Sequence, residues 1–443
     1  MKMQYYSLGK QSPNVDFKTA AITGQAPDKG LYFPSEIPQF TAEQIQKFKT
    51  LDKANLAFEV MRPYVGATID DAALKQICAD TINFEFPLLP ITDNIETLEL
   101  FHGPTLAFKD VGARFMSRCL GYFSKQDSSD TTTTVLVATS GDTGGAVANG
   151  FLGVAGVNVI ILYPKGKVSP IQEMQLTTLG QNITALEVEG SFDDCQAIVK
   201  EAFMDADLNA AYQLTSANSI NVARWLPQQL YYFFAWQQWV AKYENAAGEY
   251  PLMDVVVPSG NFGNICAGMM AKASGLPLGH FVAACNANDV VTRYLSTEKY
   301  EVKPSVATLS NAMDVGNPSN FVRIMEIMQS NYSALTHALT SYSITDADTT
   351  STIARVYKTN NYILDPHGAV AFVAAEKYLA KLDDAKIVIL ETAHPVKFPE
   401  VVEAAIGQSI TVPPSVQNLF EKQKIAIPLA PTYTEFKNWM LKK

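Results

Sequence analysis

Four segments of this 443-residue chain place polar residues and glycines where a strand-like run ends or a helix-like run begins. The first is FHGPTLAFKDVGARF at 101–115, in which Lys109 stands among leucine, alanine, phenylalanine and valine. Burial in such surroundings lowers the pKa of a lysine, and Schiff-base chemistry requires an amine of lowered pKa. Taken alone, this segment is explained more simply by a surface lysine near a helix N-terminus.

The second segment is ATSGDTGGAVANG at 138–150, which follows a strand-like run and opens a helix-like one. Ser140, Gly141, Asp142 and Thr143 would present N–H groups and hydroxyls at the positive end of a helix, a natural site for a carboxylate. An ordinary capped turn explains the same residues equally well, because Ser, Thr and Asp are the usual N-caps. The glycine spacing does not match GxGxxG, so a dinucleotide site gains no support.

The third segment is VVVPSGNFGNICAGMMAKASG at 255–275, where glycines bracket Asn261 and Phe262 before a helix expected to begin near Asn264. Glycines let the backbone approach an anion, and successive N–H groups then point at it. The segment therefore predicts a phosphate-binding loop, although the lysine and the hydroxyl residue of the P-loop are missing.

The fourth segment is KIVILETAHPVKF at 386–398, which predicts a strand that projects Thr392 at its carboxyl end. His394 stands close by. A lone histidine in a loop is more often structural than catalytic, and the same interpretation holds for His102 and His367.

These segments need a scaffold, and the chain alternates strand-like and helix-like runs from about residue 130 onward. The strand candidates are apolar on both faces, as in strands buried within a parallel sheet. Amphipathic runs of helical length separate them, such as 193–205 and 224–240. The alternation predicts an α/β protein, whose sites lie beyond the carboxyl ends of its strands. The predicted strands span 135–139, 158–164, 183–190, 253–260, 280–286 and 386–392.

The first ninety or so residues differ, because helical periodicity is broken there by proline-rich turns such as FPSEIP at 33–38. This pattern predicts a mainly helical N-terminal unit that ends near 86–90.

Composition narrows the possible partners and compartment. A net charge of -10 argues against nucleic acid and anionic membranes, which attract basic surfaces. Residues 1–10 lack the apolar core of a signal peptide, and the apolar runs are too short to cross a bilayer. We therefore expect a cytoplasmic protein without a metal site. The cysteines are odd in number, lack metal-ligand spacing and are expected to be buried thiols: Cys78, Cys119, Cys195, Cys266 and Cys285.

In this order and separation, the four segments resemble the second fold type of pyridoxal-phosphate enzymes, and more narrowly the threonine synthase family of many bacteria and fungi. The resemblance covers essentially the whole chain and implies the tryptophan synthase β-like fold. Two open, twisted, mostly parallel sheets flanked by helices would then follow the mainly helical N-terminal unit at 1–90. A large cofactor-binding unit would comprise 91–130 and 225–443, and a smaller one, 131–224, would carry the substrate loop. Further matching runs are GLYFPSEIP at 30–38, ILYPKGKVSP at 161–170, SANSIN at 216–221 and TLSNAMDVGNPSN at 308–320.

The resemblance also implies roles for individual residues. Lys109 takes the position of the lysine that forms a Schiff base with pyridoxal phosphate, and Thr392 that of the hydroxyl that bonds the pyridine nitrogen. The loop that holds the cofactor phosphate corresponds to Gly260, Asn261, Phe262, Gly263 and Asn264. The substrate positions are Ser140 and Thr143 for the carboxylate, and Lys165, Ser169, Asn218 and Arg224 for the phosphate.

The implied enzyme is a carbon–oxygen lyase that converts O-phospho-L-homoserine and water to L-threonine and phosphate, as a monomer or weak dimer. A serine/threonine dehydratase or a cysteine synthase of the same fold type is the alternative, and it predicts indifference to the substrate's phosphate. A non-catalytic relative that binds phosphorylated ligands or a protein partner is a third possibility. The intact Lys109 argues against it.

Asp142 departs from the pattern of many relatives, which carry an asparagine there that donates to the 3′-oxygen of the cofactor. An ionised aspartate cannot donate a hydrogen bond. Either the proton is shared differently, or Asp142 turns away and caps the helix.

Overall fold

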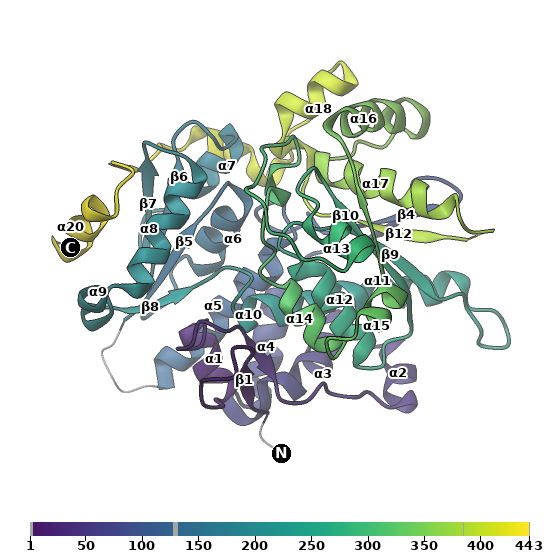
Figure 1. The fold of residues 1–443 in the computed structure, drawn as a ribbon, viewed down its shortest axis with the longest axis horizontal. Coiled ribbons are helices and arrows are strands. Elements are labelled where there is room, and N and C mark those ends of the chain that lie inside the picture. The colour runs from purple at the N-terminus through teal and green to yellow at the C-terminus, as the bar shows by residue number, and fades with distance from the viewer. Residues whose placement is uncertain (1–2, 127–131, 384, 443) are drawn as a thin grey trace.

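The structure is a computed structural model that describes residues 3–126, 132–383 and 385–442. It contains two large sheets whose strands are mostly parallel, one in each half of the molecule, with helices packed against both (Figure 1). The α/β class and the two mostly parallel sheets predicted from the sequence are therefore confirmed.

The larger sheet has six strands among the described residues. Its strands pair in parallel except at one edge, where β3 runs antiparallel to β4. The strands lie in the order β11 (Leu339–Ser343), β10 (Leu278–Cys285), β9 (Met253–Pro258), β12 (Ile387–Glu391), β4 (Ile95–Glu99) and β3 (Leu88–Pro90).

Alternate residues of β9 pack into two different cores. Val255 and Val257 pack into the core that includes α12 (Gly263–Ala273), whereas Val256 packs into the core formed with α17 (Pro366–Leu379). All three side chains are buried, so both faces of the sheet are covered. This explains why the strand reads as a continuous apolar run. The remaining helices of this half are α11 (Gln229–Tyr243), α13 (Val290–Thr297), α14 (Phe321–Ile327), α15 (Tyr332–Ala338), α16 (Asp346–Asn360) and α18 (Pro399–Ile406).

The smaller sheet has five parallel strands among the described residues. They lie in the order β13 (Ile427–Leu429), β7 (Ile183–Val188), β6 (Val157–Pro164), β5 (Thr133–Ala138) and β8 (Gln213–Ser216). The helices of this half include α5 (Lys109–Gln126), α6 (Asp142–Phe151), α7 (Pro170–Thr177), α8 (Phe192–Met204), α9 (Ala206–Ala211) and α20 (Tyr433–Lys442).

The C-terminal segment belongs to this smaller half, although the expected large unit of 225–443 included it. β13 pairs with β7, and the side chains of Leu429, Phe436 and Met440 pack into the core that lies against α8. The physical reason is that an amphipathic terminal helix buries its apolar face on the nearest uncovered surface.

The N-terminal unit contains four α-helices, each begun by an Asp or Thr that caps the helix, and an antiparallel pair of short strands that the sequence pattern did not predict. The elements are β1 (Tyr5–Ser7), α1 (Phe17–Thr23), β2 (Tyr32–Pro34), α2 (Ala42–Phe48), α3 (Lys53–Val65) and α4 (Asp71–Thr81). The run at 224–240, expected as one helix, is divided instead. A 3₁₀ turn at Leu226–Gln228, which contains Pro227, separates α10 (Val222–Trp225) from α11.

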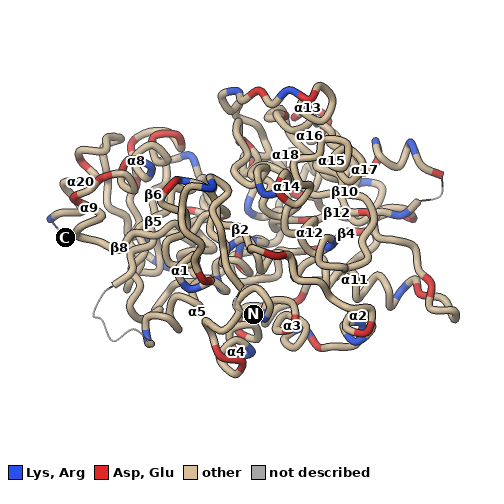
Figure 2. The backbone as a smooth tube through the Cα atoms, turned by 60° about the horizontal axis from the view of Figure 1, so that its bottom comes forward, with Lys and Arg blue, Asp and Glu red and all other residues tan. Residues whose placement is uncertain are grey.

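Lys and Arg are interspersed with Asp and Glu over the outer helices and loops (Figure 2). None of the helices in the described ranges combines the length and the apolarity that a bilayer crossing needs.

Candidate active site

Backbone hydrogen bonds join the loop before α5 to the segment that follows β12. The Phe108 N–H donates to the Thr392 carbonyl over 2.9 Å, and the His394 N–H donates to the Leu106 carbonyl over 3.0 Å. Leu106 has a φ of 59°, so the chain turns sharply before α5 begins at Lys109. The first and fourth candidate segments, far apart in the sequence, therefore lie side by side at the carboxyl end of β12.

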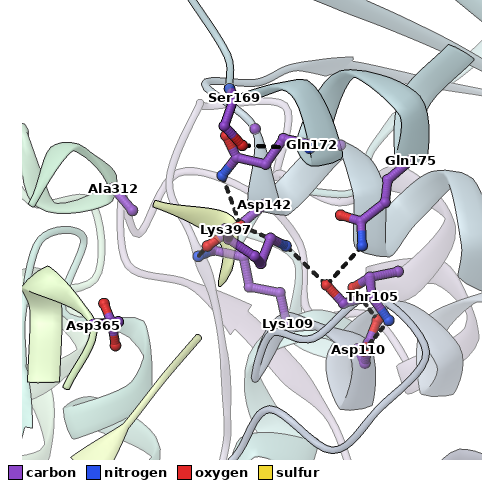
Figure 3. A network of polar contacts seen from close by, with 12 residues as sticks. Thr105, Lys109, Asp110, Asp142, Ser169, Gln172, Gln175, Ala312, Asp365 and Lys397 are labelled. Carbon is purple, nitrogen blue, oxygen red and sulfur yellow. Dashed lines mark hydrogen bonds and ion pairs between the residues drawn. The ribbon is translucent and has the colours of Figure 1, made fainter. Parts of the chain in front are cut away.

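The amine of Lys109 faces the carboxylate of Asp142 (Figure 3). Lys109 Nζ lies 3.7 Å from Asp142 Oδ2 and 4.6 Å from the centre of the Phe108 ring. Burial lowers the pKa of Lys109, and the positive charges of Lys397 and Arg224 lower it further, which outweighs the opposing effect of Asp142. This is the kind of amine that Schiff-base chemistry requires.

Asp142 is buried and held by two donors. Lys397 Nζ lies 2.7 Å from Asp142 Oδ1, and Gln172 Nε2 donates to the same oxygen over 2.9 Å. Burial raises the pKa of this carboxyl, but Lys397 and Lys109 outweigh burial and hold the pKa well below its usual value. Gly141 is the N-cap of α6, and no side chain caps this helix. Asp142 is therefore an ionised partner of lysines, and the alternative in which it caps the helix is wrong.

Lys397 is the member of this network that the sequence motifs did not single out. Its side chain is fully buried at the end of a 3₁₀ turn, and its ammonium donates to the Thr105 carbonyl over 2.8 Å. Gln175 Nε2 donates to the same carbonyl over 3.0 Å, and the Asp110 carboxylate accepts from the Thr105 N–H and hydroxyl. The run HPVKF carries the same signal as LAFKD, a lysine among apolar residues beyond a strand end.

The glycine-rich loop after β9 turns into α12 through a residue in the left-handed conformation. Phe262 has a φ of 58°, and α12 begins at Gly263, one residue before the expected start. A Cβ on Gly260 would lie 2.6 Å from Met313 Cα and 3.1 Å from the Ala312 carbonyl oxygen, so only glycine fits there. The first N–H groups of α12 have no intrahelical partner and can donate to an anion.

Asn264 supplies a further donor at this helix start. Its Oδ1 accepts from the Tyr232 hydroxyl over 2.8 Å. Its buried Nδ2 has no hydrogen-bond partner among the described residues. A buried amide without a partner costs about 1–3 kcal/mol, and a phosphate bound at the start of α12 would supply the missing acceptor. The loop therefore fits the phosphate group of the expected cofactor.

A buried polar chain fixes the backbone against which Gly260 packs. His367 Nε2 accepts from the Ala312 N–H over 3.3 Å, so Nδ1 carries the proton and donates to Asp365 over 2.5 Å. The Asp365 N–H donates in turn to Glu391 Oε1 over 2.7 Å. Burial and the charge of Asp365 raise the pKa of Glu391 well above its usual value. These contacts give His367 a structural role.

The loop after β5 presents the expected carboxylate-binding residues. Ser140 and Thr143 are partly exposed on it. The hydroxyl of Thr139 accepts from the Gly141 N–H over 3.0 Å. Gly141 has a φ of 137°, and a Cβ there would lie 2.5 Å from Gln172 Cδ. The close packing of α7 therefore fixes the loop while both hydroxyls stay accessible.

Two of the residues expected at the substrate phosphate are related to this network, Arg224 through its charge near Lys109 and Ser169 through Gln172. Arg224 is 3% exposed, and its Nη1 donates to the Ala217 carbonyl, while its Nε has no partner among the described residues. Burial lowers the pKa of Arg224 to about 10. Ser169 begins α7, and Gln172, which bonds Asp142, donates its N–H to the Ser169 hydroxyl over 3.4 Å.

The other two have different surroundings. Lys165 is 54% exposed and forms an ion pair with Glu189 over 3.1 Å. Asn218 follows β8 and is half-buried. The structure therefore does not place Lys165 in the network around Lys109, whereas Thr392 lies at the same end of β12 as the loop that carries Lys109.

Models of three protein families match this chain. The pyridoxal-phosphate dependent enzyme family matches residues 97–393, which include the candidate site. The threonine synthase N terminus matches residues 4–82, and the threonine synthase C-terminal family matches residues 368–439. The fold and the site thus define a pyridoxal-phosphate dependent enzyme.

Comparison with similar proteins identifies the family within this class of enzymes. Threonine synthase of Escherichia coli is 40% identical over 411 residues, with 93% of each chain covered. Threonine synthase of Saccharomyces cerevisiae is 36% identical, with 91% of this chain and 89% of that protein covered. The crystal structure of threonine synthase from Escherichia coli covers 99% of this chain and 100% of its own, with a TM-score of 0.90 and 38% identity. The chain belongs to the threonine synthase family.

A further solved structure bears on the cofactor. The X-ray structure of PLP-bound threonine synthase from Brucella melitensis matches with a TM-score of 0.90 and 35% identity, over 99% of this chain and 98% of that one. The resemblance drawn from the four segments is therefore confirmed, and pyridoxal phosphate is the cofactor of the chain.

Proposed function

We propose that Lys109 is the residue that binds pyridoxal phosphate covalently and moves protons in the conversion of O-phospho-L-homoserine and water to L-threonine and phosphate. The observation that carries this assignment is the position of Lys109. Its amine, with a pKa lowered by burial, lies beside the segment of Thr392 and faces the carboxylate of Asp142.

The residues of the glycine-rich loop and Thr392 hold the cofactor in this proposal. When bound, pyridoxal phosphate supplies an electron sink for charge that develops on the substrate. The N–H groups at the start of α12 and the unpaired Nδ2 of Asn264 bind its phosphate group. The hydroxyl of Thr392 bonds the pyridine nitrogen, and a hydroxyl in place of a carboxylate leaves this nitrogen largely unprotonated.

Lys109 then serves as the base and acid of the reaction. With the cofactor and substrate bound, its amine would take the α-proton of the substrate and later return a proton to the product. A lowered pKa increases the unprotonated fraction of the amine for the first task, and its conjugate acid performs the second. Asp142 stays ionised beside it throughout.

The substrate is held by its two anionic ends. Ser140 and Thr143, partly exposed on the loop that opens α6, donate to the carboxylate. Charge-assisted donors bind the phosphate. The candidates are Arg224, which is buried and whose charge acts on Lys109, and Ser169, Asn218 and Lys165.

The three units expected from the sequence are the domains in this proposal, with α5 and the C-terminal segment assigned to the smaller unit instead of the large one. We also infer a monomer or weak dimer that works in the cytoplasm on a small-molecule substrate. The net charge of -10 supports a protein that does not bind nucleic acid or anionic membranes.

The test is a product assay with purified protein, pyridoxal phosphate and O-phospho-L-homoserine, alongside Lys109→Ala. The wild type should form threonine and phosphate in equal amounts. Lys109→Ala should form neither product. If the wild type instead converts L-serine or L-threonine to a keto acid and does not use O-phospho-L-homoserine, the dehydratase alternative would be favoured. Wild-type product formation by Lys109→Ala would contradict the assignment of Lys109.

A further inference from the structure

The two carboxylate oxygens of Asp142 lie at different distances from two lysine ammonium groups. Asp142 Oδ1 lies 2.7 Å from Lys397 Nζ, a hydrogen-bonded ion pair. Asp142 Oδ2 lies 3.7 Å from Lys109 Nζ, which is beyond hydrogen-bond distance. The reactive amine therefore faces a carboxylate that is already engaged by another cation.

Lys397 is fixed so that it cannot leave this carboxylate. Its side chain is completely buried, and its ammonium donates to the Thr105 carbonyl as well as to Asp142. The Thr105 carbonyl is itself held by Gln175, and Gln172 bonds the same oxygen of Asp142 as Lys397 does. If this buried ammonium moved away from its two acceptors, its charge would be left uncompensated inside the protein, which is unfavourable.

Without Lys397, the same carboxylate would be free to pair with Lys109. Opposite charges in contact stabilise the charged form of each group. Lys109 would then hold its proton more tightly, and a protonated amine is not a base. The remaining charged and titratable groups that face this pair are Arg224, Asp110 and His394.

We propose that Lys397 is a positioning residue for Lys109: it holds the Asp142 carboxylate at its own hydrogen-bond distance and thereby keeps that carboxylate from closing to hydrogen-bond distance of the Lys109 amine. The proposal rests on the role of Lys109 given above and adds a residue that acts on it through Asp142. Its distinctive consequence is that Lys397 affects Lys109 more strongly while Asp142 is charged than when Asp142 is neutral, since only the direct repulsion between the two ammonium groups remains in the second case.

The test titrates the visible absorbance of the full-length holoenzyme with pH, because this absorbance reports protonation at the Lys109 nitrogen. The variants are Lys397→Met, Asp142→Asn and the double variant. Lys437→Met is the control, since Lys437 lies on the helix α20, away from the site. It forms ion pairs with Asp205 over 2.8 Å and with Asp207 over 2.6 Å. Lys437→Met should titrate like the wild type.

Lys397→Met should raise the midpoint by about one pH unit, and Asp142→Asn should lower it. The double variant should differ from Asp142→Asn by clearly less than Lys397→Met differs from the wild type, because only the direct effect of the Lys397 charge on Lys109 is then lost. At neutral pH, kcat of Lys397→Met should fall about tenfold with little change in KM and recover as the pH rises, which a merely structural loss would not do.

Two results would overturn the proposal. One is a Lys397→Met midpoint equal to that of Lys437→Met. The other is a double variant that differs from Asp142→Asn as much as Lys397→Met differs from the wild type, because Lys397 would then act without Asp142. If Lys397→Met fails to fold, Lys397→Gln takes its place with the same expected direction of shift, and a midpoint equal to that of Lys437→Met would overturn the proposal in the same way. Borohydride reduction followed by peptide mapping keeps this test separate from the proposed function, because it shows independently whether the cofactor sits on Lys109.

Discussion

Gly260→Ala tests the phosphate-binding loop most sharply. The added methyl group would lie 2.6 Å from Met313 Cα and 3.1 Å from the Ala312 carbonyl oxygen. Both atoms belong to backbone, and the Ala312 N–H is tied to His367, so neither can move as a flexible side chain would. Overpacking of this kind costs about 1–3 kcal/mol. If the loop relieves the clash by moving, the affinity for pyridoxal phosphate should fall about 5- to 150-fold.

The assay is an absorbance titration of the cofactor-free protein with pyridoxal phosphate, accompanied by urea unfolding of the cofactor-free and cofactor-bound states. Gly121→Ala is the matched control. Gly121 lies on the helix α5. Among the described residues, a Cβ at this position would meet only the Val154 Cγ1 atom, at 3.0 Å. Alanine in place of a helical glycine stabilises by up to about 1 kcal/mol, so this variant should bind the cofactor normally. A folded Gly260→Ala protein with wild-type affinity would refute the assignment of the loop.

Three further predictions concern other parts of the account. Thr392→Val should lower kcat about tenfold through loss of one hydrogen bond. The control Thr350→Val, at an exposed position of α16, should leave kcat unchanged. Equal kcat values for the two variants would contradict the role of Thr392. The folded-state pKa of Asp142 lies below its unfolded value, so its stabilising effect is present above about pH 4 and is lost as the pH falls. The free energy of unfolding of Asp142→Asn should therefore decline less steeply than that of the wild type below about pH 4, and parallel curves would count against the ion pair. Burial raises the pKa of Cys78 and Cys266 to about 12, and all five cysteines are free and buried. Iodoacetamide should leave them unmodified in the native protein and label all five after unfolding without reductant, as counted by intact mass.

The sequence pattern predicted the strands that are apolar on both faces. The runs at 135–139 and 253–260 correspond to β5 and β9, because strands buried on two faces usually read as continuous apolar runs. It missed β4, whose sequence IETLE carries two glutamates. Both are buried, and they are compensated by distant partners: Lys242 pairs with Glu96, and Tyr362 donates to Glu99. Charges neutralised by long-range contacts cannot be recognised from local hydrophobic periodicity.

The same distinction holds within the site. The apolar neighbours of Lys109 marked it as a candidate, although its segment alone favoured a surface lysine, and the family resemblance supplied its role; the glycine-rich loop could be found because glycine spacing is local. The pairing of Asp142 with Lys397 depends on two segments brought together only by the fold. Its omission is therefore a matter of tertiary contact, and the open question about Asp142 could be answered only in three dimensions.

The position of the covalent link tests the central claim most directly. The wild-type protein loaded with pyridoxal phosphate would be reduced with sodium borohydride, digested and mapped by mass spectrometry. We expect the cofactor on the peptide that contains Lys109 and on no other. A cofactor attached to Lys397 or to another lysine, or no attachment at all, would contradict the account of this site.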